Sequence, residues 1–341
     1  IESGVDEIWN HFQTGLPACI RSVTADLRTW VFQLAGRATI IQKHALTTVR
    51  RLQDRHQVKL VINAVGSSGV TQIALRAFRC LGVPVAKWQH GSVWHRNRIT
   101  QRMDDSDPAS ADLQCTFGSG STEAYTAAGR VNHCKIVAVG AAGLEAFSRS
   151  VASRPDPGDG VKLGGLRILY VISNYYLSNW YCGFSPPRFD GTYYRGQQVI
   201  LKYLLRCLDS DRRATLTLRP PTNYFVDYPP PWIEKLPDNP QCRVADSGES
   251  FLDLLPEHDV VVIDCPTTTL LEALCTRAHV FTLCSSPRWA DEDLELLGRR
   301  AVWDTDPEHL MEKFIRYAQE GDYLPDVGNR DFLRRHGLAA N

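Results

Sequence analysis

The spacing of hydrophobic positions changes along the chain. Up to about residue 57, apolar residues such as Ile8, Phe12, Trp30 and Leu34 recur at three- and four-residue steps, which predicts helix. From Val58 onward, short runs rich in β-branched and aromatic residues are separated by helical stretches. Strands that alternate with helices predict parallel sheets covered by helices, so the fold class is α/β.

The alternation predicts two sets of elements. In the first half, strands are expected over residues 58–64, 83–88, 113–117 and 135–139, and helices over 71–81 and 121–129. In the second half, strands are expected over 167–173, 214–218, 241–245, 259–264 and 280–283, and helices over 193–208, 251–255, 268–276 and 307–320. The first set has about four strands, and a doubly wound domain usually has five or six. Either a preceding segment is missing or this domain is small.

A stretch rich in proline and glycine separates the two sets. Residues 148–165 contain Pro155, Pro157 and four glycines and few apolar residues, which is typical of a linker. We therefore predict an N-terminal domain over residues 1–147, a linker over 148–165, a C-terminal domain over 166–325 and a tail over 326–341.

Composition narrows the class of protein. The 341 residues include 38 basic and 38 acidic side chains, so the net charge of zero argues against a general nucleic-acid binder or a polybasic membrane patch. No apolar run approaches the roughly 20 residues that span a bilayer. Because the chain starts at Ile1 without Met, a removed or truncated start stays open. Ten cysteines without a C-x-x-C pair favour reduced core thiols in a cytoplasmic protein.

The end of the strand over residues 259–264 carries the richest candidate chemistry. Pro266 and the hydroxyls of Thr267, Thr268 and Thr269 follow this strand and open a helix, where backbone N–H groups and hydroxyls can hold a phosphate or carboxylate. Glu272, about one turn into the helix, can accept hydrogen bonds from ribose hydroxyls. The alternative is a plain helix cap in which Glu272 completes a capping box.

A second strand ends at a positively charged side chain. The strand over residues 214–218 leads into Arg219 and Pro220. A guanidinium is always charged and its geometry suits phosphate. The alternative is a solvated arginine in an ordinary turn.

Two loops in the first half also follow strands. Gln89, His90 and Gly91 follow one strand and His95 lies close behind, so a histidine there could act as a base or as a hydrogen-bond donor to substrate. The other loop has glycines at 118 and 120 next to hydroxyls that could hold an anion, and an acid that could reach the substrate. Its candidate residues are Ser119, Ser121 and Glu123. A capped helix start is the alternative.

In the second half, the strand over 167–173 runs into Asn174 and Tyr175, which could bond or stack on a ligand or simply pack a seam between domains.

Three of these motifs resemble a known group when taken in chain order. Gln89-His90-Gly91, Leu218-Arg219-Pro220 and the stretch from Asp259 to Ala273 are similar to bacterial surface-polysaccharide glycosyltransferases of the GT-B fold. The group includes Kdo transferases, sialyltransferases and CDP-glycerol transferases. The stretch from Val137 to Leu144 resembles the end of the group's first domain.

The resemblance implies two Rossmann-like domains whose parallel sheets face each other across a cleft. A nucleotide-sugar donor, CMP-linked as the first expectation, would bind the second domain, and a glycan or glycolipid acceptor would bind the first. Arg219-Pro220 stands where the CMP-sugar branch has His-Pro, which puts the donor class in doubt. The donor-side residues would be Asn174, Tyr175, Arg219, Pro220, Thr267, Thr268, Thr269 and Glu272.

On the acceptor side, the resemblance implies that Gln89, Gly91, Ser119 and Ser121 contact the acceptor. The catalytic candidates are His90, His95 and Glu123. No metal or other cofactor is expected, because such enzymes neutralise the leaving phosphate with helix N-termini and basic side chains. We expect a cytoplasmic enzyme, with peripheral attachment to the inner face of the membrane left open.

Two other functions remain. A sugar-nucleotide epimerase of the same architecture would use similar phosphate contacts but no acceptor. A non-catalytic glycan- or nucleotide-binding module of a larger synthase would bind without turnover.

Overall fold

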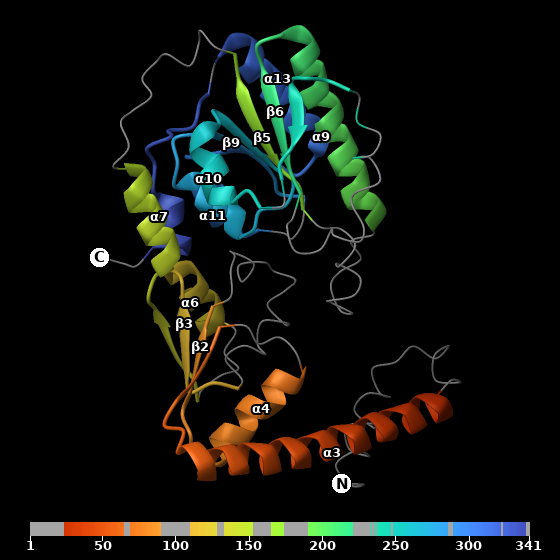
Figure 1. Ribbon diagram of the computed structural model, residues 1–341, viewed down its shortest axis with the longest axis vertical. Helices are drawn as coiled ribbons and strands as arrows, with labels where there is room; N and C mark the ends of the chain where they lie inside the picture. Colours follow the sequence, from red (N-terminus) through yellow and green to blue (C-terminus); the bar gives the residue numbers. More distant parts are fainter. Residues whose placement is uncertain are drawn as a thin grey trace. The chain divides into compact units, whose positions relative to one another are not determined.

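The computed structural model describes most of the chain (Figure 1). The described residues are 24–64, 69–89, 110–127, 133–152, 165–173, 190–220, 233, 236, 238–246, 248–285, 289–321 and 323–338. They divide into two compact units, which we treat separately. Unit 1 contains α3 (Thr24–His56), β1 (Val61–Asn63), α4 (Gly69–Cys80), β2 (Val85–Trp88) and the first residues of β3 (Leu113–Thr116) and β4 (Lys135–Ala138).

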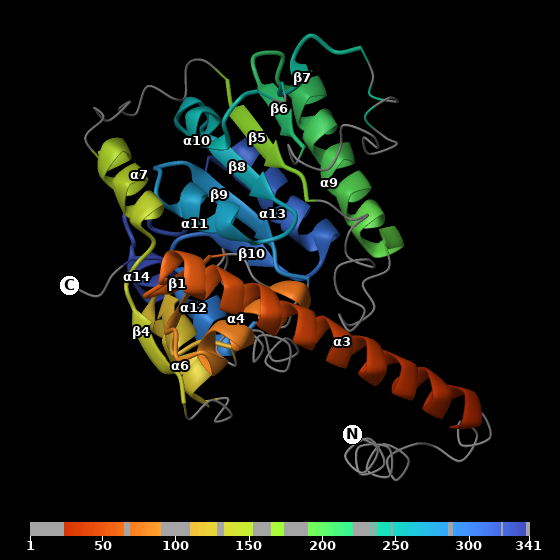
Figure 2. The same cartoon turned by 60° about the horizontal axis from the view of Figure 1, so that its bottom comes forward.

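Unit 1 is built around the start of a four-stranded sheet with the order β1-β2-β3-β4, in which β1 and β2 run parallel. Leu75 of α4, Val85 of β2 and Ala111 form its small buried core. Asp112 holds two elements to this core, since one carboxylate oxygen accepts from Arg79 Nε at 2.9 Å and the other from Val85 N at 2.9 Å. The long helix α3 packs on α4 (Figure 2). The four strands and two helices predicted for this half are confirmed.

Unit 2 contains the rest of the described chain. Its elements are α6 (Ser119–Ala127), α7 (Ala142–Ala152), β5 (Arg167–Val171), α9 (Asp190–Ser210), β6 (Thr215–Arg219), β7 (Cys242–Val244), α10 (Phe251–Leu254), a 3-10 turn (Leu255–Glu257), β8 (Val260–Ile263), α11 (Thr268–Leu274), β9 (His279–Leu283), α12 (Asp291–Gly298), β10 (Val302–Asp304), α13 (Pro307–Glu320) and α14 (Asp331–His336).

The second sheet has six parallel strands in the order β10-β9-β8-β5-β6-β7. From β5, the chain builds outward through β6 and β7 and then returns to place β8, β9 and β10 on the other side. The strand order therefore reverses at β5 and β8. Ligands of open parallel sheets bind at such a switch point, just beyond the carboxyl ends of the strands.

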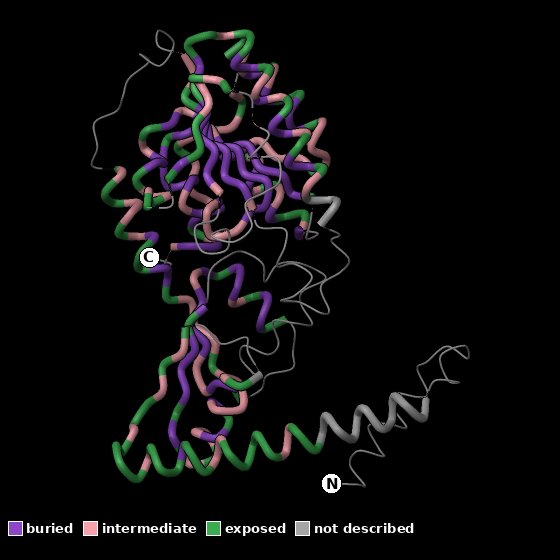
Figure 3. Tube along the Cα trace, turned by 45° about the vertical axis from the view of Figure 1, so that its right-hand side comes forward, coloured by how far each residue is buried: buried purple, intermediate pink, exposed green. Residues whose placement is uncertain are grey.

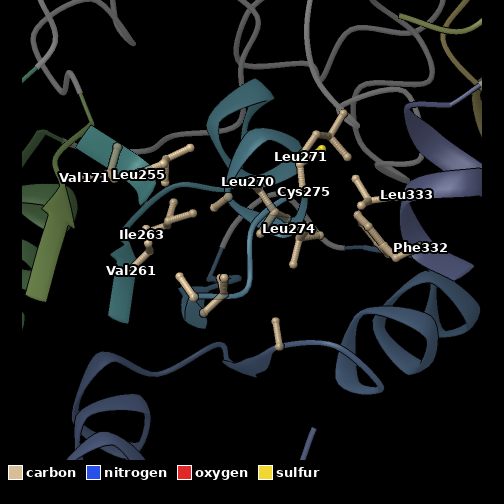
Figure 4. Close-up of a cluster of buried hydrophobic side chains, with 14 of the residues drawn as sticks. Val171, Leu255, Val261, Ile263, Leu270, Leu271, Leu274, Cys275, Phe332 and Leu333 are labelled. Carbon is tan, nitrogen blue, oxygen red and sulfur yellow. The ribbon is translucent and has the colours of Figure 1, made fainter. Parts of the chain in front are cut away.

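Helices cover both faces of this sheet, and its central strands are the most buried of the described residues (Figure 3). Alternate strand residues point to opposite faces, as the strand period requires. Ile168, Leu216 and Val262 pack against α9 and α13 on one face, whereas Val171 and Ile263 pack against α10 and α11 on the other. Figure 4 shows this second cluster, to which α14 contributes Phe332 and Leu333.

Two of the predicted boundaries are wrong in detail. Residues 148–152 belong to α7 rather than to the linker, because the helix-breaking residues begin only at Pro155. The expected tail over 326–341 includes α14, whose Phe332, Leu333 and His336 are buried. The helices α7, α12 and α14 and the three-residue strand β10 were not predicted, since short elements show little periodicity.

The cysteines fit the predicted reduced state where the structure describes them. Cys115, Cys207, Cys265, Cys275 and Cys284 are buried, and none of the described cysteines forms a disulfide.

Candidate functional site

The carboxyl ends of β6, β5 and β8 bring the strongest candidates to one edge of the second sheet. Arg219 is the register partner of Val171, and Val171 is the register partner of Ile263. Neighbouring strands lie about 4.8 Å apart, so the Cα atoms of Arg219 and Ile263 are about 10 Å apart. This spacing can accommodate the phosphate and ribose of one nucleotide.

Arg219 is a buried cation with unused hydrogen-bonding capacity. Its side chain closes β6 and leaves only 7% of the residue exposed. Nη1 donates to Pro220 O at 2.6 Å, whereas Nε has no hydrogen-bond partner among the described residues. Burial lowers the pKa of the guanidinium, and the nearby charge of Glu249 opposes this effect. An acceptor oxygen brought by a ligand would satisfy this donor.

The loop after β8 presents hydroxyls. Thr267 is the N-cap of α11, but its side chain makes no capping bond and lies 3.1 Å from Thr269 Oγ1 instead. Thr267, Thr268 and Thr269 are all half-buried. Because α11 has only seven residues, its dipole is weak, and anion binding at this loop depends on side chains more than on the helix terminus.

Glu272 is a partly buried carboxylate on α11. With Thr267 as N-cap, the third helical position is Leu270, so Glu272 lies too far along the helix to complete a capping box. No hydrogen bond or ion pair to its carboxylate is found among the described residues. Burial raises its pKa from 4.5 to about 7. These facts argue against the capping interpretation and leave Glu272 able to bind a hydroxyl-bearing ligand.

Two arginines hold the far end of α11. Arg330 Nη1 donates to Leu274 O and Cys275 O at 3.3 and 3.2 Å. The fully buried Arg300 donates through Nη2 to Thr276 O and Ala278 O at 2.8 and 3.1 Å. Cations at the carboxyl end of a helix satisfy its free carbonyls and complement its dipole. They fix the helix that carries Glu272.

Sequence reasoning missed a buried polar network at the same edge. Asp264, directly after β8, accepts from Ser173 N at 2.8 Å through Oδ1 and from Gln197 Nε2 at 2.9 Å through Oδ2. The hydroxyl of Tyr170 also donates to Oδ2 at 3.3 Å. Burial raises the pKa of Asp264 to about 6, and the hydrogen bonds oppose this shift. The sequence contained one signal for this network, which was a carboxylate directly after a strand made only of apolar residues.

The loop between β3 and α6 favours the second of its two interpretations, a helix start packed against the chain. Gly118 and Gly120 do not form an anion-binding loop, because α14 occupies the space beside them. A Cβ atom on Gly118 would collide with the backbone of Arg335, and one on Gly120 would lie 2.6 Å from His336 Cε1. The hydroxyls of Thr116 and Thr122 lie 2.7 Å apart, and both are within 3.3 Å of Gly118 O.

The acceptor-side candidates that the structure describes have structural surroundings. Gln89 is buried, and its Oε1 accepts from Phe117 N at 2.7 Å, so it holds the β3–α6 loop. Ser119 is exposed. Ser121 is buried, and its hydroxyl has no hydrogen-bond partner among the described residues.

Glu123 belongs to a charged cluster rather than to an open site. Its carboxylate binds Arg335 at 3.3 and 2.7 Å. Arg335 also contacts Glu292 at 3.0 Å and Asp293 at 3.1 Å, and His336 Nε2 lies 3.1 Å from Asp293. Asp293 and His336 are fully buried. This cluster ties α6 and α12 to α14, which gives Glu123 a structural function and makes it a poor candidate for a catalytic base.

Five candidates lie outside the described residues, namely His90, Gly91, His95, Asn174 and Tyr175. Among the residues that are described, no group of three or more histidine, cysteine, aspartate or glutamate side chains is arranged to hold a metal ion. No helix in the described part of the chain is long and apolar enough to cross a membrane.

Comparisons with known proteins identify the architecture. No protein-family model and no curated protein matches the sequence. The UDP co-structure of S. aureus MnaA superposes with a TM-score of 0.58 at 12% identity, covering 88% of this chain and 76% of that chain. UDP-GlcNAc 2-epimerase from Neisseria meningitidis, bound to UDP-GlcNAc, gives a TM-score of 0.56 at 11% identity and covers 89% and 77%. Anabaena Alr3699/HepE in complex with UDP gives 0.50 at 15% identity and covers 85% and 78%.

At these identities, the likeness establishes the fold alone. The chain has the GT-B fold, as the sequence predicted.

Proposed function

We propose that this chain is a glycosyltransferase that binds the nucleotide of an activated sugar at the carboxyl edge of the second sheet. The observation that carries the proposal is Arg219, a buried cation with an unpartnered Nε beside the switch point of the sheet. A buried charge is costly unless an acceptor is supplied. The phosphate of a nucleotide-sugar would supply one, and it gains negative charge as the sugar departs.

Neighbouring side chains suit the rest of a nucleotide. The hydroxyls of Thr267, Thr268 and Thr269 would hydrogen-bond phosphate oxygens, and the carboxyl group of Glu272 would bind ribose hydroxyls. Pro220 would keep Arg219 at the strand end, and Asn174 and Tyr175 would contact the donor from the β5 side. Arg219 and the hydroxyls would neutralise the leaving group, so we propose catalysis without a metal.

The donor that we propose first is CMP-linked, such as CMP-Kdo or CMP-sialic acid. The three motifs resemble the group that contains CMP-sugar enzymes, with Arg219-Pro220 in place of their His-Pro, and a leaving CMP has one phosphate for Arg219 to bind. The structures with which the chain superposes hold UDP or UDP-GlcNAc, so a UDP-linked donor is the direct competitor.

The acceptor hydroxyl must lose its proton as it attacks. Because Glu123 is engaged by Arg335, we assign the base to His90 or His95. Gln89, Gly91, Ser119 and Ser121 stay proposed acceptor-side residues, and the acceptor is a bacterial surface glycan or glycolipid. The site of action is the cytoplasm.

An epimerase is the second candidate. Two of the superposed structures are UDP-GlcNAc 2-epimerases, from Neisseria meningitidis and Methanocaldococcus jannaschii. An epimerase would change the sugar of its donor without any acceptor. Products from UDP-GlcNAc and CMP-sialic acid, analysed with and without oligosaccharide acceptors, separate the two. Nucleotide release that needs the acceptor supports transfer, whereas an altered nucleotide-sugar formed without acceptor supports epimerisation.

Binding is tested by titrating CMP, CDP, UDP, GDP and ADP into wild type, Arg219→Met and Arg213→Met. Arg213 is the matched control, since it precedes the same strand at its other end and its side chain is 63% exposed. Loss of a charged hydrogen bond costs about 1.5–3 kcal/mol. We therefore expect Arg219→Met to weaken the preferred nucleotide about 10- to 150-fold and Arg213→Met to leave it unchanged.

Equal nucleotide affinities in the two arginine variants would show that Arg219 does not bind the phosphate. A preference for UDP would replace the CMP donor. A folded wild type that binds no nucleotide would overturn the proposed function, whereas binding without any turnover would favour a non-catalytic module.

A further inference from the structure

We propose that Asp264 is a positioning residue that fixes the end of β5 at Ser173 and thereby sets the spacing of the two nucleotide-binding strand ends on either side. This inference rests on the proposed function. Asp264 itself contacts no substrate in the proposal and acts through the backbone of Ser173.

The first step is the geometry around Ser173. Both peptide groups of this residue are held, because its N–H donates to Asp264 Oδ1 at 2.8 Å and its C=O accepts from Gln197 Nε2 at 2.9 Å. The same Gln197 nitrogen donates to Asp264 Oδ2 at 2.9 Å. The side chains of Asp264 and Gln197 therefore hydrogen-bond to each other and to both backbone groups of Ser173, which lies two positions after the end of β5. We call this arrangement the bracket.

The second step connects this bracket to the proposed phosphate ligand. Ile172 N, one residue earlier, donates to Arg219 O at 3.0 Å. Consecutive residues at the end of β5 are therefore bonded to β6 on one side and to the β8–α11 loop on the other. Thr267 lies three residues beyond Asp264 in that loop. A shift of Ser173 would change the separation between Arg219 and the threonine hydroxyls.

The third step is energetic. Asp264 is 3% exposed, and its neighbours Val171 and Ile263 are apolar. The groups that face its carboxylate are the hydroxyl of Tyr170, the amide of Gln197 and the backbone of Ser173, with no cation among the described residues. Burying a carboxylate on hydrogen bonds alone is costly. This costly burial of the carboxylate occurs at the switch point of the sheet, where the end of β5 must keep its position while a ligand binds.

The hydrogen bonds of this network can be altered by substitutions that keep the size of the two side chains. In Asp264→Asn, the new amide keeps one acceptor for Ser173 N, but its NH₂ group faces the NH₂ group of Gln197. Adding Gln197→Glu restores a donor–acceptor pair between the two side chains. Asp259→Asn is the matched control, because Asp259 precedes the same strand and binds Arg167 at its opposite end.

The experiment measures two quantities in wild type, D264N, Q197E, the double variant and D259N. Titration calorimetry with UDP and with CMP gives nucleotide affinity, and amide hydrogen exchange gives the protection of Ser173 N–H. We expect D264N to weaken the preferred nucleotide at least 10-fold and to speed exchange at Ser173. The double variant should recover part of both losses, and D259N should keep wild-type affinity within twofold.

The outcomes separate this inference from the proposed function. Wild type that binds UDP or CMP, with D264N binding equally well, would overturn the positioning role and leave the proposed function intact. Unchanged exchange at Ser173 would overturn the bracket itself. Wild type that binds neither nucleotide would overturn the proposed function. If D264N does not fold, Gln197→Met, which removes the donor to Ser173 O without adding a second buried charge beside Asp264, takes its place with the same expectations.

Discussion

Two loops of this molecule have similar sequences and different surroundings. Both follow a parallel strand, contain small or hydroxyl residues, open a helix and carry a glutamate within the first two turns. In the β3–α6 loop, the chain's own α14 occupies the space beside Gly118 and Gly120, and Glu123 is paired with Arg335. In the β8–α11 loop, Glu272 has no hydrogen-bond partner among the described residues, and Arg219 lies two strands away with an unused donor.

The difference shows how a structural loop can be told from a ligand-binding loop. Glycines allow close approach of a neighbour, and the neighbour can be a ligand or another part of the chain. Unsatisfied buried groups occur at both loops, the Ser121 hydroxyl among them, so the informative difference is whether the charged group at each loop has a partner. The β3–α6 loop has its charged group satisfied, whereas the β8–α11 edge has a charge waiting for a partner.

The largest loss of stability is expected from replacing Asp293, the buried carboxylate of the charged cluster beside the β3–α6 loop. Asp293→Ala removes the carboxylate that holds Arg335 and the buried His336. Breaking a buried ion pair costs about 3–5 kcal/mol. Glu292→Gln removes the exposed partner of the same Arg335 and should cost about 0–1 kcal/mol. Urea unfolding measures both, and equal losses would contradict the division of this cluster into a buried and an exposed part.

The second-largest loss of stability is expected from adding a side chain at Gly118, because α14 already occupies the adjacent space. Gly118→Ala places a Cβ against the backbone of Arg335, and overpacking of this kind costs about 1–3 kcal/mol. Gly143→Ala is the control, because nothing lies within 4 Å of its Cβ position in helix α7 and alanine favours helix. It should be neutral or slightly stabilising. If Gly118→Ala weakened nucleotide binding and left stability unchanged, the anion-loop interpretation would return.

A further effect on stability, below that of Asp293→Ala, is expected from the binding loop. Burial raises the pKa of Glu272 from 4.5 to about 7, so the folded protein holds this proton more tightly than the unfolded chain. Its stabilising contribution is complete below about pH 4.5 and is lost as the pH rises through 7. Glu272→Gln should remove this dependence and raise stability at pH 8 by about 1–2 kcal/mol, while weakening nucleotide binding.

Glu123→Gln is the corresponding change in the other loop. We expect a small loss of stability and unchanged nucleotide affinity, because the Glu123 side chain is itself about half exposed and its ion pair with Arg335 is therefore weak. Urea unfolding between pH 4 and 8 with and without nucleotide compares the two variants directly. Wild-type stability that rises from pH 5 to 8 in a way that Glu272→Gln abolishes would contradict the buried, unpaired carboxylate.

Much of the second sheet could be predicted from local pattern. The apolar run at 260–263 between polar ends specifies a buried strand wherever it lies, and the threonines after it mark the helix start. The position of Arg219 at the same edge as this loop followed from the parallel sheet, because all carboxyl ends meet there. The strand order that leaves only β5 between them could not be predicted. The network around Asp264 could not be predicted, since Gln197 is 67 positions away and its partner is fixed only by packing.

The sequence left two interpretations of the β3–α6 loop open for the same reason. Gly118 and Gly120 identify a close approach, but the partner is 215 or more positions later in the chain and carries no motif. Glu123 likewise gave no sign of Arg335. Local sequence therefore predicts that a loop makes room for something, and long-range contacts determine what fills it.

The pairing of α6 with α14 also constrains how the chain folds during synthesis. Glu123 and Arg335 are 212 positions apart, whereas Arg167 and Asp259 of the second sheet are 92 apart. At about 5–20 residues per second, α6 leaves the ribosome roughly 10–40 s before its partner exists. During this interval its glycine-lined side is uncovered, and it stays available to chaperones or to other nascent chains. A helix made late in translation closes a surface that was made early.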